Sequence, residues 1–96
     1  MLIARVEGSA VSTIKDPELT GIKLLVVRAA GVDGEPTGAA FVAADAVGAG
    51  LGELVLVATG SAARQTKLTR ERPLDAVIMG ILDSLEAGGE VTFRKS

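Results

Sequence analysis

The sequence predicts an all-β domain, a small barrel or sandwich of five or six short strands. Segments rich in β-branched residues alternate along the chain with glycine-rich turns, which is typical of such folds. The 96 residues leave room for one core, so a single domain over residues 1–96 is expected. Apolar residues make up 48% and charged residues 23%, a composition that favours a packed core over disorder.

The first strand is predicted over residues 2–14, where small and β-branched residues dominate. Its side chains alternate between two faces, with Leu2, Ala4 and Val6 on one and Arg5, Glu7 and Ser9 on the other. Gly8 interrupts the strand and predicts a bulge or bend. Residues 15–18 contain a proline and charges, so we expect a loop there.

The middle of the chain predicts three strands, at residues 23–30, 39–47 and 53–59. The turn cluster at residues 31–36 is expected to join the first two as a hairpin. Apolar residues of these strands fall on both faces. Because a small barrel has one interior, outward-facing apolar residues from several strands indicate that neighbouring subunits cover them.

The segment from Pro73 to Leu85 leaves two interpretations open. Its apolar residues fit a helical stripe with a proline near the start, whereas Gly80 and the run at residues 77–79 favour a short helical turn leading into a strand. Before this segment, residues 65–72 are polar and predict a solvated connection. After it, Gly88 and Gly89 predict a turn, and residues 90–95 a short edge strand.

Composition argues against an enzyme. The sequence has no cysteine and no histidine, so it lacks the commonest metal ligands and the commonest general base, and we expect no catalytic residue, cofactor or metal site. Ser61 has no histidine to activate it. The apolar runs are far shorter than the roughly 20 residues that span a bilayer, so a cytoplasmic protein without a membrane partner is expected.

Nucleic acid is the alternative partner, because small OB-like barrels bind single strands. The net charge of −2 opposes contacts with phosphates, and Phe41 and Phe93 are the only aromatic residues available for stacking on bases. The glycines at residues 48, 50 and 52 do not have nucleotide-loop spacing and precede a strand, so a barrel turn explains them better. A nucleic-acid partner is therefore not expected.

Several segments together resemble the CcmL/EutN family of bacterial microcompartment vertex proteins. The most characteristic run extends from Asp45 to Val57 and is followed by residues 60–64. The other matching segments, in the family's order and spacing, are residues 2–8, 15–17, 21–27 and 73–83. The resemblance covers nearly the whole chain.

This resemblance implies a five-stranded OB-like β-barrel with a short helical turn from Pro73 to Asp75, a last barrel strand from Ile78 to Asp83 and a C-terminal β extension. It also implies a homopentamer with a narrow axial channel at the fivefold vertices of a protein shell in the cytoplasm. Such shells are tiled by hexameric and trimeric proteins, which would be the partners. The implied role is structural and not enzymatic.

Two segments are predicted to serve the assembly. A subunit interface is expected at Gly48, Ala49, Gly50, Gly52, Glu53 and Arg64. There the glycines would allow close backbone approach or positive φ, so Gly50→Val should disturb folding or assembly. Glu53 would accept hydrogen bonds from a neighbouring subunit. An axial pore loop is expected at Gly60, Ser61, Ala62 and Ala63, because side chains that meet their own copies around an axis must be small.

Overall fold

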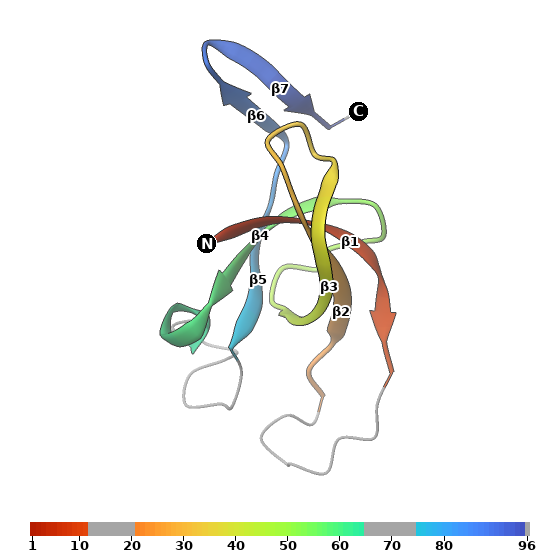
Figure 1. Ribbon diagram of the computed structural model, residues 1–96. Helices are drawn as coiled ribbons and strands as arrows, with labels where there is room; N and C mark the ends of the chain where they lie inside the picture. The colour runs from red at the N-terminus through yellow and green to blue at the C-terminus, as the bar shows by residue number, and fades with distance from the viewer. Residues whose placement is uncertain (12–20, 65–74, 96) are drawn as a thin grey trace.

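A computed structural model describes residues 1–11, 21–64 and 75–95. Five strands form a closed barrel in the order β1-β2-β3-β5-β4 (Figure 1). The barrel strands are β1 (Leu2–Ala10), β2 (Leu24–Ala30), β3 (Pro36–Asp45), β4 (Leu54–Thr59) and β5 (Ala76–Ile81). A 3-10 helix, η2 (Gly60–Arg64), follows β4, and a separate two-stranded sheet pairs β6 (Ser84–Ala87) with β7 (Glu90–Arg94). The predicted all-β barrel with a C-terminal β extension is confirmed.

The strand pairings close the barrel unevenly. Four neighbouring pairs are antiparallel and extend over several residues each. The closing pair, β3 with β5, is parallel and joins only Ala44 to Val77 and Asp45 to Ile78. Among the described residues, the β5-facing edge of β3 before Ala44 therefore has no strand partner. The predicted irregularity at Gly8 is confirmed as a register shift between Val6 and Gly8 in the β1–β2 pair.

The barrel interior is filled by small and branched apolar side chains from all five strands. The buried members of this cluster are Ala4, Val6, Leu25, Val27, Ala43, Ala49, Val55, Val57 and Ile78. Most of them alternate along their strands, as Leu25 and Val27 do in β2, because successive residues of a strand point to opposite faces. Removing this apolar surface from water is the main force that stabilises the barrel.

A second buried cluster lies apart from the barrel core. It consists of Ile22, Ala44, Ala63 and Val77, each at most 8% exposed. Val77 and Ile78 are neighbours in β5, both are 0% exposed, and they belong to different clusters. Their successive burial shows that both faces of β5 are covered. The outward face of β5, which the sequence suggested a neighbouring subunit would cover, is thus covered by Ala63 of the same chain.

The sequence leaves the segment from Pro73 to Leu85 open between a helix and a strand, and the strand interpretation is correct. Residues 76–81 form β5, and the continuous helical stripe from Pro73 to Leu85 was wrong, because consecutive apolar residues here serve two opposite faces of one strand. The implied helical turn at residues 73–75 lies outside the described residues, apart from Asp75. The helical turn that the structure does describe, η2, comes earlier, in the segment predicted to be the axial pore loop.

Asp45 ends β3 two residues before the predicted boundary. Its carboxylate is almost fully buried, and Oδ1 accepts hydrogen bonds from the backbone N–H groups of Val47, Gly48 and Ala49, at 3.0, 3.0 and 3.2 Å. Lys23 Nζ lies 3.9 Å from Oδ2. Because these amides bond to a side chain instead of a strand, the chain turns here and places Ala49 in the barrel core.

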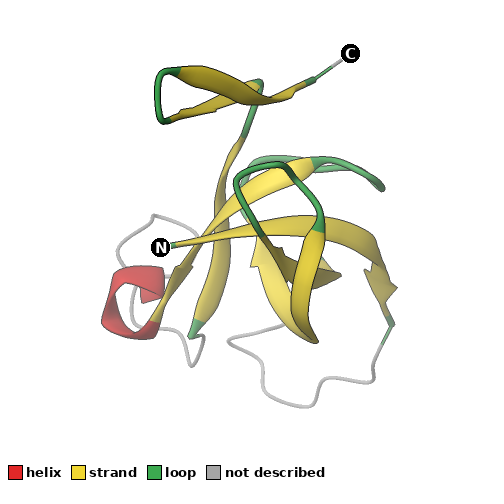
Figure 2. Ribbon diagram, turned by 45° about the horizontal axis from the view of Figure 1, so that its top comes forward, coloured by secondary structure: helices red, strands yellow, loops and turns green. Residues whose placement is uncertain are grey.

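The C-terminal hairpin stands away from the barrel in both overall views (Figures 1 and 2). Leu85 pairs with Phe93 and Ala87 with Glu90, and a register shift separates Leu85 from Glu86. Strand β7 matches the predicted edge strand, whereas β6 was not predicted. None of the helices in the described part of the chain has the length and apolar character that a membrane span requires.

Candidate assembly surfaces

The turn before β4 is held rigidly by hydrogen bonds. Gly50 N–H donates to Glu53 Oε1 at 2.6 Å, and Glu53 N–H donates to the Gly50 carbonyl at 3.2 Å. The neighbouring β1 accepts from Gly52 N–H at the Val6 carbonyl, at 2.9 Å. Positive φ angles occur at Gly48 and Gly52, 76° and 83°. The turn therefore has one fixed shape instead of behaving as a loose loop.

Two expectations about this turn need correction, and a third is not tested by the structure. Gly50 does not have a positive φ, so backbone strain is the wrong reason to expect an effect of Gly50→Val. Ala49 is 1% exposed and packs in its own barrel, so its side chain does not meet a neighbour. Glu53 accepts from Gly50 and from Lys95 of its own chain, and its acceptance of a hydrogen bond from another subunit stays a prediction. The placement of this turn at a subunit boundary stays a prediction.

The Glu53–Lys95 pair ties the C-terminal hairpin to the turn. Lys95 Nζ lies 2.7 Å from Glu53 Oε2, and both side chains are partly exposed. The hydrogen bond from Lys95, followed by that from the Gly50 amide, lowers the pKa of Glu53 below its ordinary value. The same hydrogen bond to Glu53 raises the pKa of Lys95. Each charge therefore stabilises the charged form of the other.

Arg5 forms a second link between the barrel and the hairpin. Its Nε and Nη2 donate to the Gly34 carbonyl at 2.9 and 2.7 Å, and its Nη1 donates to the Gly52 carbonyl at 2.8 Å. The guanidinium carbon lies 5.8 Å from the centroid of the Phe93 ring. Gly34 has a φ of 82°, and a Cβ there would lie 2.7 Å from Arg5 Nη2, so a side chain at this position would strain the backbone and displace the guanidinium. Sequence reasoning missed this cluster, because its acceptors are main-chain carbonyls.

The predicted axial loop forms η2, and its residues divide into two groups. Gly60, Ser61 and Ala62 are exposed, whereas Ala63 is 0% exposed and packs against the second cluster. Ala63 is therefore covered by its own chain and cannot line an opening, which corrects that part of the prediction. Gly60 has a φ of 62° and donates its N–H to the Asp75 carbonyl at 2.9 Å. The side chain of Arg64 lies outside the described residues.

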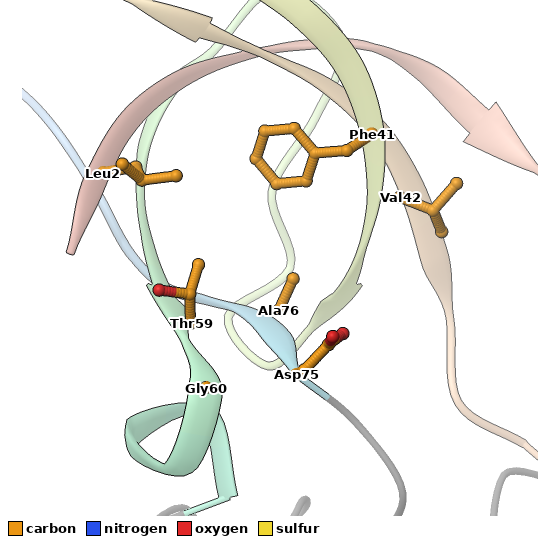
Figure 3. A pocket seen from close by; sticks show the side chains of 7 residues that line it. All are labelled: Leu2, Phe41, Val42, Thr59, Gly60, Asp75 and Ala76. Atoms are coloured by element: carbon orange, nitrogen blue, oxygen red, sulfur yellow. The ribbon is translucent and has the colours of Figure 1, made fainter.

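An open apolar hollow of about 360 Å³ lies beside Gly60 (Figure 3). It is lined by Leu2, Phe41, Val42, Thr59, Gly60, Asp75 and Ala76. The Phe41 ring points from β3 across the hollow, toward the side on which Leu2 and Thr59 lie (Figure 3). Val42 is 49% exposed and Leu2 41%. Among the described residues, the hollow lies where the β5-facing edge of β3 has no strand partner. The apolar pattern of β3 was the only sequence signal for it.

The described residues show no arrangement suited to the alternative roles. Within residues 1–11, 21–64 and 75–95, no group of three or more acidic side chains could hold a metal ion. Phe41 lines the hollow beside Gly60, whereas Phe93 lies over Arg5 at the hairpin, so the two aromatic residues share no stacking surface. What the surface offers is exposed apolar side chains and rigid turns, which suit contacts between proteins.

Comparison with known proteins gives consistent results. A sequence profile described as ethanolamine utilisation protein EutN/carboxysome matches residues 1–83. The chain is 47% identical over 95 residues to the carboxysome shell vertex protein CcmL of Synechocystis sp., covering 99% of this chain and 95% of that protein. It is 42% identical over 95 residues to the bacterial microcompartment shell vertex protein EutN of Salmonella typhimurium, covering 99% and 96%.

Solved structures agree with the sequence relatives. A structure titled carboxysome subunit, CcmL, superimposes with a TM-score of 0.92 at 47% identity and covers both chains completely. The GrpN pentameric microcompartment shell protein from Rhodospirillum rubrum superimposes with a TM-score of 0.82 at 42% identity, covering 91% of this chain and 99% of that one. These relatives favour the shell-vertex interpretation over the nucleic-acid alternative. The chain belongs to the EutN/CcmL family.

Proposed function

We propose that this protein is a structural subunit of a bacterial microcompartment shell, in which five copies form a ring that caps a fivefold vertex. The observation that carries this proposal is the 47% identity, over almost the full length of both chains, to a protein named as a carboxysome shell vertex protein. A relative of the same fold is titled pentameric. The role requires a defined shape and complementary surfaces, and no chemical reaction.

The surface of the single chain supports assembly. Leu51 is 76% exposed, Val91 50%, Val42 49% and Leu2 41%. These exposed apolar side chains come from several strands and turns. Association with further copies of the chain would bury their apolar surface and remove it from water. A ring of five also has a geometric use. Hexagonal tiles alone form a flat sheet, and pentagons introduce the curvature that closes a shell, so we expect hexameric and trimeric shell proteins as neighbours in the bacterial cytoplasm.

The exposed part of η2 is our candidate for the region around the fivefold axis. Gly60, Ser61 and Ala62 carry the small side chains that close approach of five copies demands. Ala63 fixes this turn to the barrel, because its side chain packs against Val77 and Ala44. Ser61→Trp is therefore expected to obstruct the opening or prevent ring closure. A ring structure with Ser61 far from the axis would contradict this placement without affecting the vertex role.

Native mass measurement tests the proposal directly. Five copies of the 9.7 kDa chain should give a particle of about 48.5 kDa at micromolar concentration. A stable monomer would contradict the proposal. In a second measurement, a hexameric shell protein is assembled with and without this chain and observed by electron microscopy. We expect closed particles only in its presence, and sheets or open tubes in its absence.

A further inference from the structure

Closed rings place a strict condition on the surface of each subunit. In a cyclic pentamer the contact is head to tail, so one face of each copy must fit a different face of the next. Two complementary apolar features at separate places on the same barrel would meet this condition. This inference rests on the proposed function and goes beyond it, because it assigns the two faces.

The Phe41 hollow is one of these features. It is open to solvent, it is bordered by the half-exposed Leu2 and Val42, and it lies at the part of β3 whose β5-facing edge has no strand partner among the described residues. Among the described residues that line it, Asp75 alone is charged, and its side chain is exposed. The hollow therefore presents an apolar floor with one negative charge at its border.

Leu51 is the second feature. It is 76% exposed at the tip of the turn before β4, and the hydrogen bonds of Gly50, Gly52 and Glu53 fix that turn. An apolar side chain that a rigid turn holds in water gains most from burial by a partner, because little conformational freedom remains to be lost. The exposed valines at positions 32, 47 and 91 are smaller and less exposed.

The two features lie at opposite ends of β4. The Leu51 turn leads into Leu54, and the hollow includes Thr59 and Gly60 at the other end. Six residues of strand span roughly 17–20 Å. Both overall views show the chain before β4 on the side of the barrel away from η2 (Figures 1 and 2). A contact between them cannot form within one chain, but it repeats naturally from copy to copy.

The charges at the borders of the two features are opposite in sign. The surface around Leu51 includes Arg5, Arg94 and Lys95 against the single carboxylate of Glu53, an excess of two positive charges. The hollow carries Asp75. Opposite charges at the borders of an apolar contact favour one register and one orientation of approach.

We propose that Leu51 of one copy inserts into the Phe41 hollow of the next copy, so that each subunit offers a protruding residue at one end of β4 and receives its neighbour's at the other. The occupant of the hollow is thus a second copy of this chain. The positive border around Leu51 meets Asp75 of the neighbour. Five repeats of this single contact close the ring.

The absence of cysteine from the sequence makes a cross-linking test unambiguous. Two double variants, Leu51→Cys with Leu2→Cys and Leu51→Cys with Val42→Cys, are oxidised with diamide and run on a denaturing gel without reductant. Since each copy carries both halves of the contact, we expect a ladder from two to five copies. Each single variant should run as a monomer on this gel. A mixture of the two corresponding single variants should give covalent dimers and no larger species.

The matched control is Leu51→Cys with Val32→Cys. Val32 is 48% exposed, almost as much as Val42, but it lies in the β2–β3 turn and not at the hollow. It should give no ladder. Under reducing conditions the ring mass of every variant is measured first. Cysteine is smaller than leucine, so rings that carry Leu51→Cys should be weaker than the parent ring, and oxidation is carried out at a protein concentration at which they still form.

The outcomes separate this inference from the proposed function. An intact ring without a ladder above the control in both double variants would overturn the inference and leave the vertex role standing. A covalent dimer of the Leu51→Cys single variant would show a like-to-like contact and also overturn it. A monomeric parent protein would overturn the proposed function itself. As a second measurement, Leu51→Asp should weaken ring association at least tenfold, whereas Leu51→Met should not.

Discussion

The barrel and the C-terminal hairpin are both built mainly from antiparallel strand pairs, yet they are stabilised in different ways. Every buried apolar side chain found in the described residues lies between Ala4 and Ile78, and none lies in β6 or β7. The barrel closes on itself and covers its interior, whereas a lone two-stranded hairpin has only marginal stability in water. The hairpin therefore depends on what it touches, mainly Arg5 and Glu53.

The family match follows the same division. The matching profile ends at residue 83, directly before Ser84 begins β6. The part of the chain that carries its own core is thus the part that the family profile describes, and the part that depends on a few contacts lies outside it. Stability and attachment are consequently separable by mutation, and each of the following changes tests that separation.

Ile78→Ala should have the largest effect. Ile78 is 0% exposed in the barrel core, and truncation of a buried isoleucine costs about 2–5 kcal/mol of unfolding free energy. Denaturant unfolding at fixed protein concentration measures it. Val91→Ala in the hairpin is the control and should change stability by less than about 0.5 kcal/mol. Equal losses in both variants would contradict the division between barrel and hairpin.

Asp45→Ala should have the next largest effect. It leaves three backbone N–H groups without their acceptor next to the core residue Ala49, at a cost of about 1–3 kcal/mol. Asp33→Ala is the matched control, because Asp33 accepts only one exposed backbone N–H, that of Glu35. Denaturant unfolding should separate the two variants clearly. A loss at Asp45 no larger than that at Asp33 would show that the buried carboxylate is not essential for the turn.

Phe93→Ala should affect the hairpin alone. The contact between the Arg5 guanidinium and the ring contributes about 0.5–1 kcal/mol at a site of this kind. We expect faster hydrogen exchange of the β6 and β7 amides, with exchange in β1 and β4 unchanged. Thr92→Ser, next to it in β7, provides the control. Faster exchange throughout the barrel would mean that the hairpin supports the core, contrary to the division.

The smallest effect is expected from pH. The lowered pKa of Glu53 means that its share of the Glu53–Lys95 contact is complete above the ordinary glutamate value of 4.5 and is lost as pH falls through the lowered value. The raised pKa of Lys95 means that its share is complete below 10.5 and is lost as pH rises further. Exchange protection of the hairpin should thus be constant through neutrality and fall in acid. Glu53→Gln should remove this dependence on acid pH. If the Glu53→Gln variant still lost exchange protection in acid, another group would be responsible for the loss.

Much of the fold was predictable because its signals are local. Alternation and turn residues located the first four strands within a few residues, and Gly8 marked the irregularity in β1. The secondary structure of residues 76–81 was not predictable from their apolar pattern. Successive burial of Val77 and Ile78 looks helical until one knows that Ala63 covers the outer face, and that contact joins residues 14 positions apart.

The candidate surfaces were less predictable because they depend on distant or unmarked partners. Glu53 meets Lys95 from 42 residues away, and Arg5 binds carbonyl groups that every residue has. Strand β6 contains no β-branched residue, so nothing in its four residues favours a strand over a helix. Leu51 and Phe41 were visible only as apolar residues, since exposure and the shape of a hollow are properties of the folded chain.

The way Arg5 holds the hairpin has a consequence for how such proteins diversify. Its acceptors are the Gly34 and Gly52 carbonyls, which are main-chain atoms and survive most substitutions in their loops. A chain that keeps an arginine at this position, glycine at position 34 and an aromatic ring at position 93 can therefore exchange the rest of its C-terminal segment without redesigning the barrel. The hairpin is in this sense a graftable module, and a different peptide fused after residue 83 offers a practical route to new outer contacts on an unchanged scaffold.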